Sequence, residues 1–159
     1  MGRIWSRVAP IPLLSLSVVV AACGPSTGDA QSYEVQAINL PGPGRVLADG
    51  AGHVLYVYVP DAQGPSKCFS GCANAWPPLI LPYGIRHPVG GPGVDDALLG
   101  TTRRQNGSLQ VTYNRWPLYL YIGDGRGQAT GQAEDMGSWY LLSTSGAVDQ
   151  RPVTGPVNT

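Results

Sequence analysis

Charged residues are scarce in this sequence: Asp, Glu, Lys and Arg together make up only 13% of its 159 residues. Of the 10 basic residues, Arg3 and Arg7 lie at the extreme N-terminus, so 8 basic side chains face 10 acidic ones in the rest of the chain. A nucleic-acid-binding domain needs a concentrated positive surface, because the phosphate backbone dominates its affinity. The composition therefore argues against a nucleic-acid partner.

Histidine and cysteine are also few, with two and three residues respectively. The chain has no Cys-x-x-Cys-His motif for covalent haem and no histidine pair at helical spacing for zinc. A calcium loop between Asp124 and Asp135 fails because Arg126 stands where a ligand is required. Ser26 matches the G-x-S-x-G motif only within a linker, without the strand and helix that this motif needs. These absences favour a non-enzymatic protein over an enzyme.

The longest apolar run is too short for a transmembrane helix. It extends from Val8 to Val20, contains Pro10 and Pro12, and follows two arginines. A positively charged start and a short apolar run are typical of a secretory signal peptide. We therefore expect residues 1–22 to be a signal peptide.

The end of this run, Val20-Ala21-Ala22-Cys23, resembles the bacterial lipobox, whose cysteine is acylated and becomes the mature N-terminus. The resemblance implies that Cys23 carries lipid and that residues 23–32 form the lipidated cysteine and its flexible tether. The expected location is then extracytoplasmic, with the protein anchored to the cell membrane or envelope. The alternative is a secreted protein in which Cys23 is incidental.

Two stretches, LYVYVPD from Leu55 and LYLYIGD from Leu118, are near copies at an offset of 63 residues. The same offset aligns seven identical pairs without a gap: Leu55 and Leu118, Tyr56 and Tyr119, Tyr58 and Tyr121, Asp61 and Asp124, Gly64 and Gly127, Trp76 and Trp139, Leu79 and Leu142. Seven matches, two of them tryptophans, indicate a duplication. We place the copies at about residues 44–84 and 107–147, within a domain of residues 33–147 that a loose polar tail (148–159) follows.

Each copy has the pattern of β structure. Tyr56 and Tyr58 share one face of a strand because side chains alternate, and Val57 between them is also apolar, so both faces should be covered. Asn106-Gly107 is a hairpin-turn signal, and no long amphipathic helix is found. The sequence predicts an all-β fold: two pseudo-symmetric repeats forming one compact β-sandwich or barrel-like domain with short helical turns.

Structural roles are expected for the repeated residues. Trp76 and Trp139 stand beside apolar residues at equivalent positions, which favours two core plugs over an aromatic ligand platform. Asp61 and Asp124 end their strands, where a carboxylate can accept backbone N–H bonds from the exit loop. The expected donors are residues 62–64 and 125–127.

Cys68 and Cys72 are four residues apart, a spacing that one helical turn brings to a Cα separation of about 6 Å, within disulfide range. A disulfide is the expected state outside the cytoplasm. The alternative is a copper or thiol-redox site in which these cysteines act with His53 or His87, since thiolate and imidazole suit Cu(I).

The two copies resemble a bacterial lipoprotein family of secreted repeats marked by a Tyr-x-aromatic-x-x-Asp motif. The matching features are the motif itself, the Cys-x-x-x-Cys segment with WPPL after it, the run GVDDALLGTTRRQNGSLQVTYN, and WPLY from Trp116. They cover most of residues 44–146. The resemblance implies a secreted protein and no assigned function.

The anchor and the missing catalytic groups lead to one functional expectation. We expect a non-enzymatic accessory or binding module that uses no cofactor and is held on membrane lipid by Cys23. Its expected partner is a membrane protein complex, such as a respiratory or envelope assembly.

Overall fold

The computed structural model describes residues 1–2 and 33–155, so the expected signal peptide, Cys23 and the tether lie outside the described residues. The strands are β1 (Glu34–Leu40), β2 (Gly44–Asp49), β3 (Tyr56–Tyr58), β4 (Val89–Gly90), β5 (Leu99–Arg103), β6 (Leu109–Tyr113), β7 (Trp116–Pro117), β8 (Trp139–Leu142) and β9 (Val148–Asp149). The helical elements are all short: η1 (Val59–Asp61), α1 (Gly71–Ala75), η2 (Asp96–Leu98) and α2 (Glu134–Gly137).

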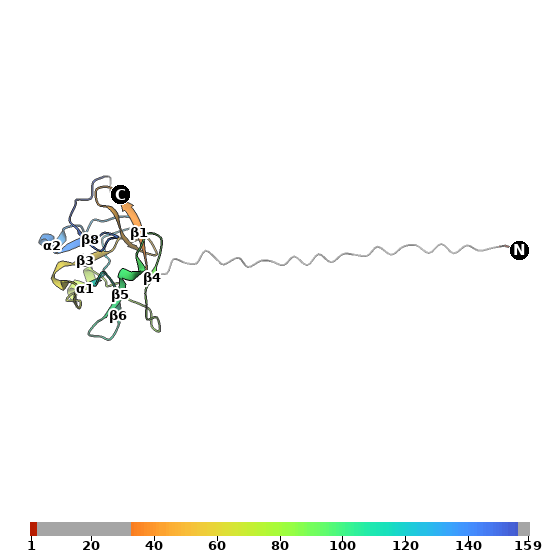
Figure 1. The fold of residues 1–159 in the computed structure, drawn as a ribbon, viewed down its shortest axis with the longest axis horizontal. Coiled ribbons are helices and arrows are strands. Elements are labelled where there is room, and N and C mark those ends of the chain that lie inside the picture. Colours follow the sequence, from red (N-terminus) through yellow and green to blue (C-terminus); the bar gives the residue numbers. More distant parts are fainter. Residues whose placement is uncertain (3–32, 156–159) are drawn as a thin grey trace.

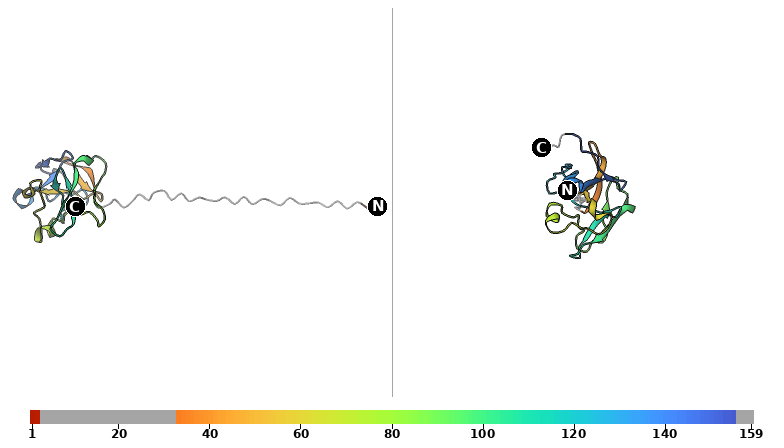
Figure 2. Two further views of the ribbon diagram at one scale, coloured as in Figure 1. Left: turned by 60° about the horizontal axis from the view of Figure 1, so that its bottom comes forward. Right: turned by 90° about the vertical axis from the view of Figure 1, so that its left-hand side faces the viewer.

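The strands form three small sheets, with the orders β2-β1-β4, β3-β8-β9 and β5-β6-β7. All neighbours are antiparallel except β1 and β4. Figures 1 and 2 show α1 and α2 along one edge of the domain and β1 and β4 toward the opposite edge, with the β5–β6 hairpin extending away from both. The predicted all-β, sandwich-like fold is confirmed, and none of the three sheets closes into a barrel.

Local turn chemistry explains several of these strands. Asp49 accepts backbone N–H bonds from Ala51 and His53 at 3.0 and 2.8 Å, which turns the chain from β2 toward β3. The Asn106-Gly107 turn joins β5 to β6 as expected, since Gly107 has a φ of +84° and Asn106 accepts from the Ser108 N–H.

The two copies meet where Tyr56 and Tyr119 pair as antiparallel neighbours. The backbone N–H of Tyr56 donates to the Tyr119 carbonyl at 2.8 Å, and the reverse bond is 3.0 Å. On its other side Tyr56 pairs with Leu141, and Tyr119 pairs with Pro78, which is the equivalent position at the 63-residue offset. A pseudo-twofold axis therefore runs between the two tyrosines, and each central strand lies between segments of the other copy.

Both faces of these central strands are covered, as expected. Leu55, Tyr56 and Val57 each have no exposed surface. Leu55 and Val57 belong to one core cluster with Leu118, whereas Tyr56 and its equivalent Tyr119 belong to a second cluster with the two repeat tryptophans. The alternation of side chains along one short strand thus builds both halves of the core.

Residues 148–155, the described part of the expected loose tail, pack against the domain. Val148–Asp149 pair with β8 as β9, and Val153 packs against the second core cluster. Asp149 is 6% exposed and forms an ion pair with Arg151, which lowers the pKa of the Asp149 carboxyl. The polar composition predicted a tail. The ion pair with Arg151 compensates the buried charge of Asp149, so this segment can pack against the domain.

Candidate functional site

The centre of the molecule is a pair of crossed hydrogen bonds between the tyrosine of one copy and the aspartate of the other. The Tyr56 hydroxyl donates to Asp124 Oδ2 at 2.5 Å, and the Tyr119 hydroxyl donates to Asp61 Oδ2 at 2.6 Å. Both tyrosines have no exposed surface. Each repeat motif is therefore completed by the other copy.

The second oxygen of each aspartate holds a loop, although not through the donors that were expected. Asp61 Oδ1 accepts the Lys67 N–H at 2.7 Å, and Asp124 Oδ1 accepts the Thr130 N–H at 2.8 Å. Both donors stand six residues after their aspartate, so the loops that close are longer than residues 62–64 and 125–127. Thr130 adds its hydroxyl at 2.6 Å to the same Asp124 oxygen.

Burial sets the protonation of these pairs. Desolvation, together with the hydrogen bond to a carboxylate, raises the pKa of Tyr56 and of Tyr119 well above the ordinary tyrosine value. Desolvation also raises the pKa of Asp61, while the bonds from Tyr119 and Lys67 act in the opposite direction. The raised pKa values of Tyr56 and Tyr119 favour neutral tyrosines that donate their hydroxyl hydrogens.

Alkaline pH should destabilise the fold through Tyr56 and Tyr119. Because their folded pKa values are raised, the stability they contribute is complete below the ordinary value of about 10. It is lost as pH rises above that value, where tyrosines of the unfolded chain ionise and the folded ones do not. Above that point, each of the two tyrosines should lower the free energy of unfolding by about 1.4 kcal/mol per pH unit.

Urea unfolding from neutral pH to above pH 10 measures this slope. Tyr56→Phe and Tyr119→Phe should each reduce this slope by the contribution of one tyrosine. An unchanged slope in both core variants would contradict the assignment.

Four stacked aromatic rings lie beside the crossed pairs, and we call them the aromatic ladder: Tyr121, Trp76, Trp139 and Tyr58. The two tryptophans stack with ring centroids 4.0 Å apart and planes 4° from parallel. Tyr121 stacks on Trp76 at 4.3 Å, and Tyr58 stacks on Trp139 at 4.5 Å. The tyrosine at each end thus stacks on the tryptophan of the other copy.

The ladder also contacts the crossed pairs at their rings. Tyr56 lies edge-on to Trp76 at 5.2 Å, and Tyr119 lies edge-on to Trp139 at 5.1 Å. The tryptophans are core residues, at 3% and 0% exposure. They form one joint stack instead of the two separate plugs that the repeat suggested.

The ladder reaches the surface in a cleft of about 360 Å³ between α1 and α2, where Tyr58 and Tyr121 are half-buried. Asp135 lines this cleft and accepts a bond from Trp139 Nε1 at 3.1 Å. A flat or apolar group could enter here, but both tryptophans already stack on neighbouring rings. The cleft is therefore the accessible margin of the core.

Cys68 and Cys72 form the expected disulfide, with Cα atoms 5.3 Å apart, and it links the segment before α1 to the first turn of that helix. Bonded sulfurs offer no thiolate to Cu(I). His53 lies 3.2 Å from Asp49, while His87 is exposed in the loop before β4. In the described part of the chain, no three His, Cys, Asp or Glu side chains come together as a metal site.

A buried arginine that sequence reasoning missed supports the first copy. Arg104 is 8% exposed, and its guanidinium donates to Ser66 Oγ at 2.7 Å, Gln110 Oε1 at 2.6 Å and the Cys68 carbonyl at 2.7 Å. Ser66 Oγ lies 2.7 Å from the Tyr119 hydroxyl, which joins the arginine to a crossed pair. The segment TTRRQNG has only a turn signal, so nothing in it marked one arginine as buried.

The fold and its centre define a class: a two-copy all-β protein whose duplicated Tyr-x-aromatic-x-x-Asp motif interlocks across a pseudo-twofold axis. The chain belongs to the family described as secreted repeat of unknown function, whose sequence model matches residues 41–80 and 100–143. Comparison with curated proteins and with solved structures gives no match. No helix among the described residues is long and apolar enough to cross a bilayer.

Proposed function

We propose that this protein is a lipid-anchored extracytoplasmic module that binds a membrane protein complex and has no catalytic activity of its own. One observation carries the proposal: in both Asp61 and Asp124, each carboxylate oxygen accepts a hydrogen bond from within the domain. A carboxylate so engaged is a poor general acid or base, because a catalytic group must reach a substrate. The duplicated motif then builds a rigid body whose outer surface is left for binding.

The anchor is supported by the N-terminal sequence. A short apolar run and a lipobox-like VAAC precede the tether, and the family is one of secreted repeats. Acyl chains on Cys23 would hold the protein on a bilayer by about 0.8 kcal/mol per buried methylene. A tether of residues 24–32 would keep the domain within about 30 Å of the surface.

Confinement to this thin layer gives the module its advantage as a binding partner. An anchored domain meets other membrane proteins at a raised effective concentration, so a weak interface suffices. The expected partner class is a respiratory or envelope complex with an extracytoplasmic face.

Affinity purification from membranes solubilised in mild detergent tests the partner. A C-terminally tagged protein should recover a membrane complex in fixed stoichiometry, and the same tag on the Cys23→Ser protein should recover much less. Recovery of the free monomer alone under mild conditions, after crosslinking in intact cells, would contradict the proposal.

The anchor makes a separate prediction. Cys23→Ser should leave the signal uncleaved by the lipoprotein pathway or release the processed protein to the medium, because the described residues contain no helix that could hold it in a bilayer. Cell fractionation with mass spectrometry of the N-terminus is the measurement. A processed Cys23→Ser protein that stays in the membrane fraction would show that lipid on Cys23 is not the anchor.

A further inference from the structure

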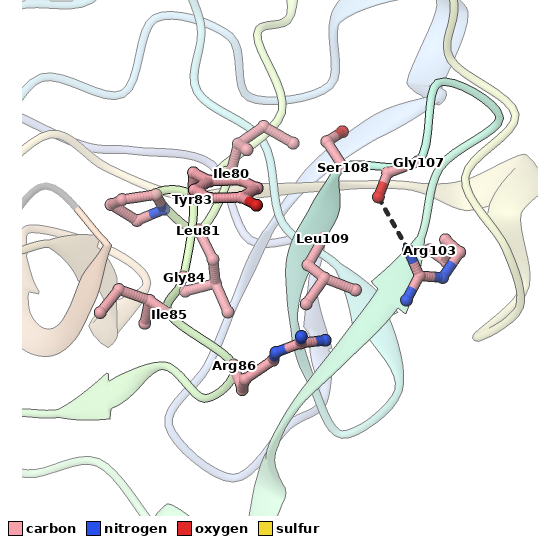
Figure 3. A pocket seen from close by; sticks show the side chains of 11 residues that line it. Ile80, Leu81, Tyr83, Gly84, Ile85, Arg86, Arg103, Gly107, Ser108 and Leu109 are labelled. Atoms are coloured by element: carbon pink, nitrogen blue, oxygen red, sulfur yellow. Dashed lines mark hydrogen bonds between the residues drawn. The ribbon is translucent and has the colours of Figure 1, made fainter.

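An apolar pocket of about 530 Å³ lies between residues 80–86, which follow WPPL, and the β5–β6 hairpin. Leu81, Ile85 and Leu109 line it together with Tyr83, Arg86 and Arg103. Figure 3 shows Leu109 between the two arginine side chains, with Ile85 and Leu81 across from it. None of the crossed pairs or ladder residues lines this pocket.

Two of the exposed large apolar side chains, Tyr83 and Ile85, lie in the loop of residues 82–87, which we call the Tyr83 loop. All six of its residues are exposed; Tyr83 is fully exposed and Ile85 is 37% exposed. The Ile85 N–H donates to the Pro82 carbonyl at 3.0 Å, and Gly84 has a φ of +89°, which closes a tight turn with Tyr83 at its tip. An aromatic and an aliphatic side chain are thus held outward on a fixed turn.

The charge on this face is positive. Arg86 makes no hydrogen bond or ion pair with any described residue, and Arg103 donates to the Gly107 carbonyl at 2.9 Å. No acidic side chain lines the pocket. Asp96 lies further along, in a neighbouring pocket with His87. Two guanidinium groups therefore flank the apolar side chains without a carboxylate among them.

The loop emerges beside the point where the domain begins. β1 starts at Glu34, which pairs with Val89 of β4, two residues after the Tyr83 loop ends. The described part of the domain therefore begins at this edge, with β1 beside β4 (Figure 1). If Cys23 is anchored, a tether of so few residues keeps this edge close to the bilayer.

We propose that the Tyr83 loop and Arg103 form a membrane-contact patch for an anionic phospholipid surface, which rests on the proposed lipid anchor. Tyr83 and Ile85 enter the boundary between headgroups and acyl chains, where amphipathic aromatic rings are favoured. Arg86 and Arg103 pair with lipid phosphates, for which the guanidinium fork is suited. The patch is a second attachment that fixes which face the anchored domain turns away from the membrane.

The test uses the full acylated protein in vesicles of phosphatidylglycerol mixed with phosphatidylcholine. An environment-sensitive fluorophore is attached at His87→Cys, which leaves Tyr83, Ile85 and Arg86 intact; Cys68 and Cys72 do not react because they are bonded. The matched control is Met136→Cys, which is also exposed but lies on α2 at the opposite edge. Emission at position 87 should shift to shorter wavelength and be quenched by nitroxide-labelled lipid, and emission at position 136 should not.

Three variants then separate the contributions of charge and apolar side chains. Arg86→Gln and Arg103→Gln should each lower the contacting population on anionic vesicles about fivefold and change little on phosphatidylcholine alone. Tyr83→Ser with Ile85→Ser should lower it on both. All these positions are exposed, so unchanged denaturant midpoints confirm that the variants fold.

Mass spectrometry of the same preparation reports whether Cys23 is acylated, so failure of the anchor is read separately. If acyl chains are present and position 87 stays in water on vesicles, the patch is rejected while the anchor stands. If acyl chains are absent, the anchor fails and the patch is rejected as a second attachment. Shielding of position 87 in native membranes but not on vesicles would assign the face to a protein and overturn the proposal.

Discussion

Neither half of the domain is expected to fold alone, although each contains a complete copy of the repeat. We divide the domain into residues 33–93 and 94–155. In the first half β3 would lose both of its neighbours, because it pairs with β8 and with Tyr119. Each separate half should show no cooperative unfolding by circular dichroism. An equimolar mixture of the two halves should unfold cooperatively.

The mixture is also the control, because it shows that cutting the chain between the copies does no harm by itself. Calorimetry and proton NMR of the mixture should match those of the uncut chain. A first half that unfolds cooperatively by itself would show that the copies are independent units, which the crossed pairing does not allow.

Replacing Trp139 by alanine should lower the free energy of unfolding by about 3–5 kcal/mol, the range for a large aromatic removed from a core. Trp139 has no exposed surface, stacks on Trp76 and Tyr58, and meets Tyr119 edge-on. Its loss leaves a cavity and removes three ring contacts. Urea unfolding at neutral pH measures the effect.

Alanine variants of two further tryptophans provide comparisons for this result. Trp76→Ala should cost a similar amount, since Trp76 holds the equivalent position and is 3% exposed. Trp116→Ala should cost clearly less, because Trp116 is half-buried at the margin of the other core cluster. If Trp116→Ala and Trp139→Ala lowered the free energy of unfolding equally, stacking in the aromatic ladder would add no stability beyond that of ordinary burial.

Local features of the fold could be predicted from the sequence because short-range chemistry determines them. The Asn106-Gly107 turn and the Cys68–Cys72 disulfide each depend on residues within one turn of chain. Alternation at Tyr56, Val57 and Tyr58 predicted a strand covered on both faces; Tyr56 and Val57 have no exposed surface, and Tyr58 is half-buried. These features need no knowledge of the partner strand.

The crossing could not be predicted, because a motif that occurs in both copies carries no information on which copy completes it. Tyr56 could have met Asp61 or Asp124, and the pattern is identical in either case. The observed bonds span 68 and 58 residues, which no periodicity reports. The same ambiguity concealed the joint stacking of Trp76 and Trp139.

The central claim is that the duplicated motif is an interlocked scaffold, and double-mutant cycles test it most directly. Tyr→Phe is combined with Asp→Ala at all four motif positions, and urea unfolding gives the free energies; each Asp→Ala alone should cost about 1–3 kcal/mol. The cross-copy pairs Tyr56 with Asp124 and Tyr119 with Asp61 should couple by about 1 kcal/mol or more, and the same-copy pairs by less than about 0.5 kcal/mol. Aspartate variants with near-wild-type midpoints, or stronger coupling within a copy than between copies, would contradict the account.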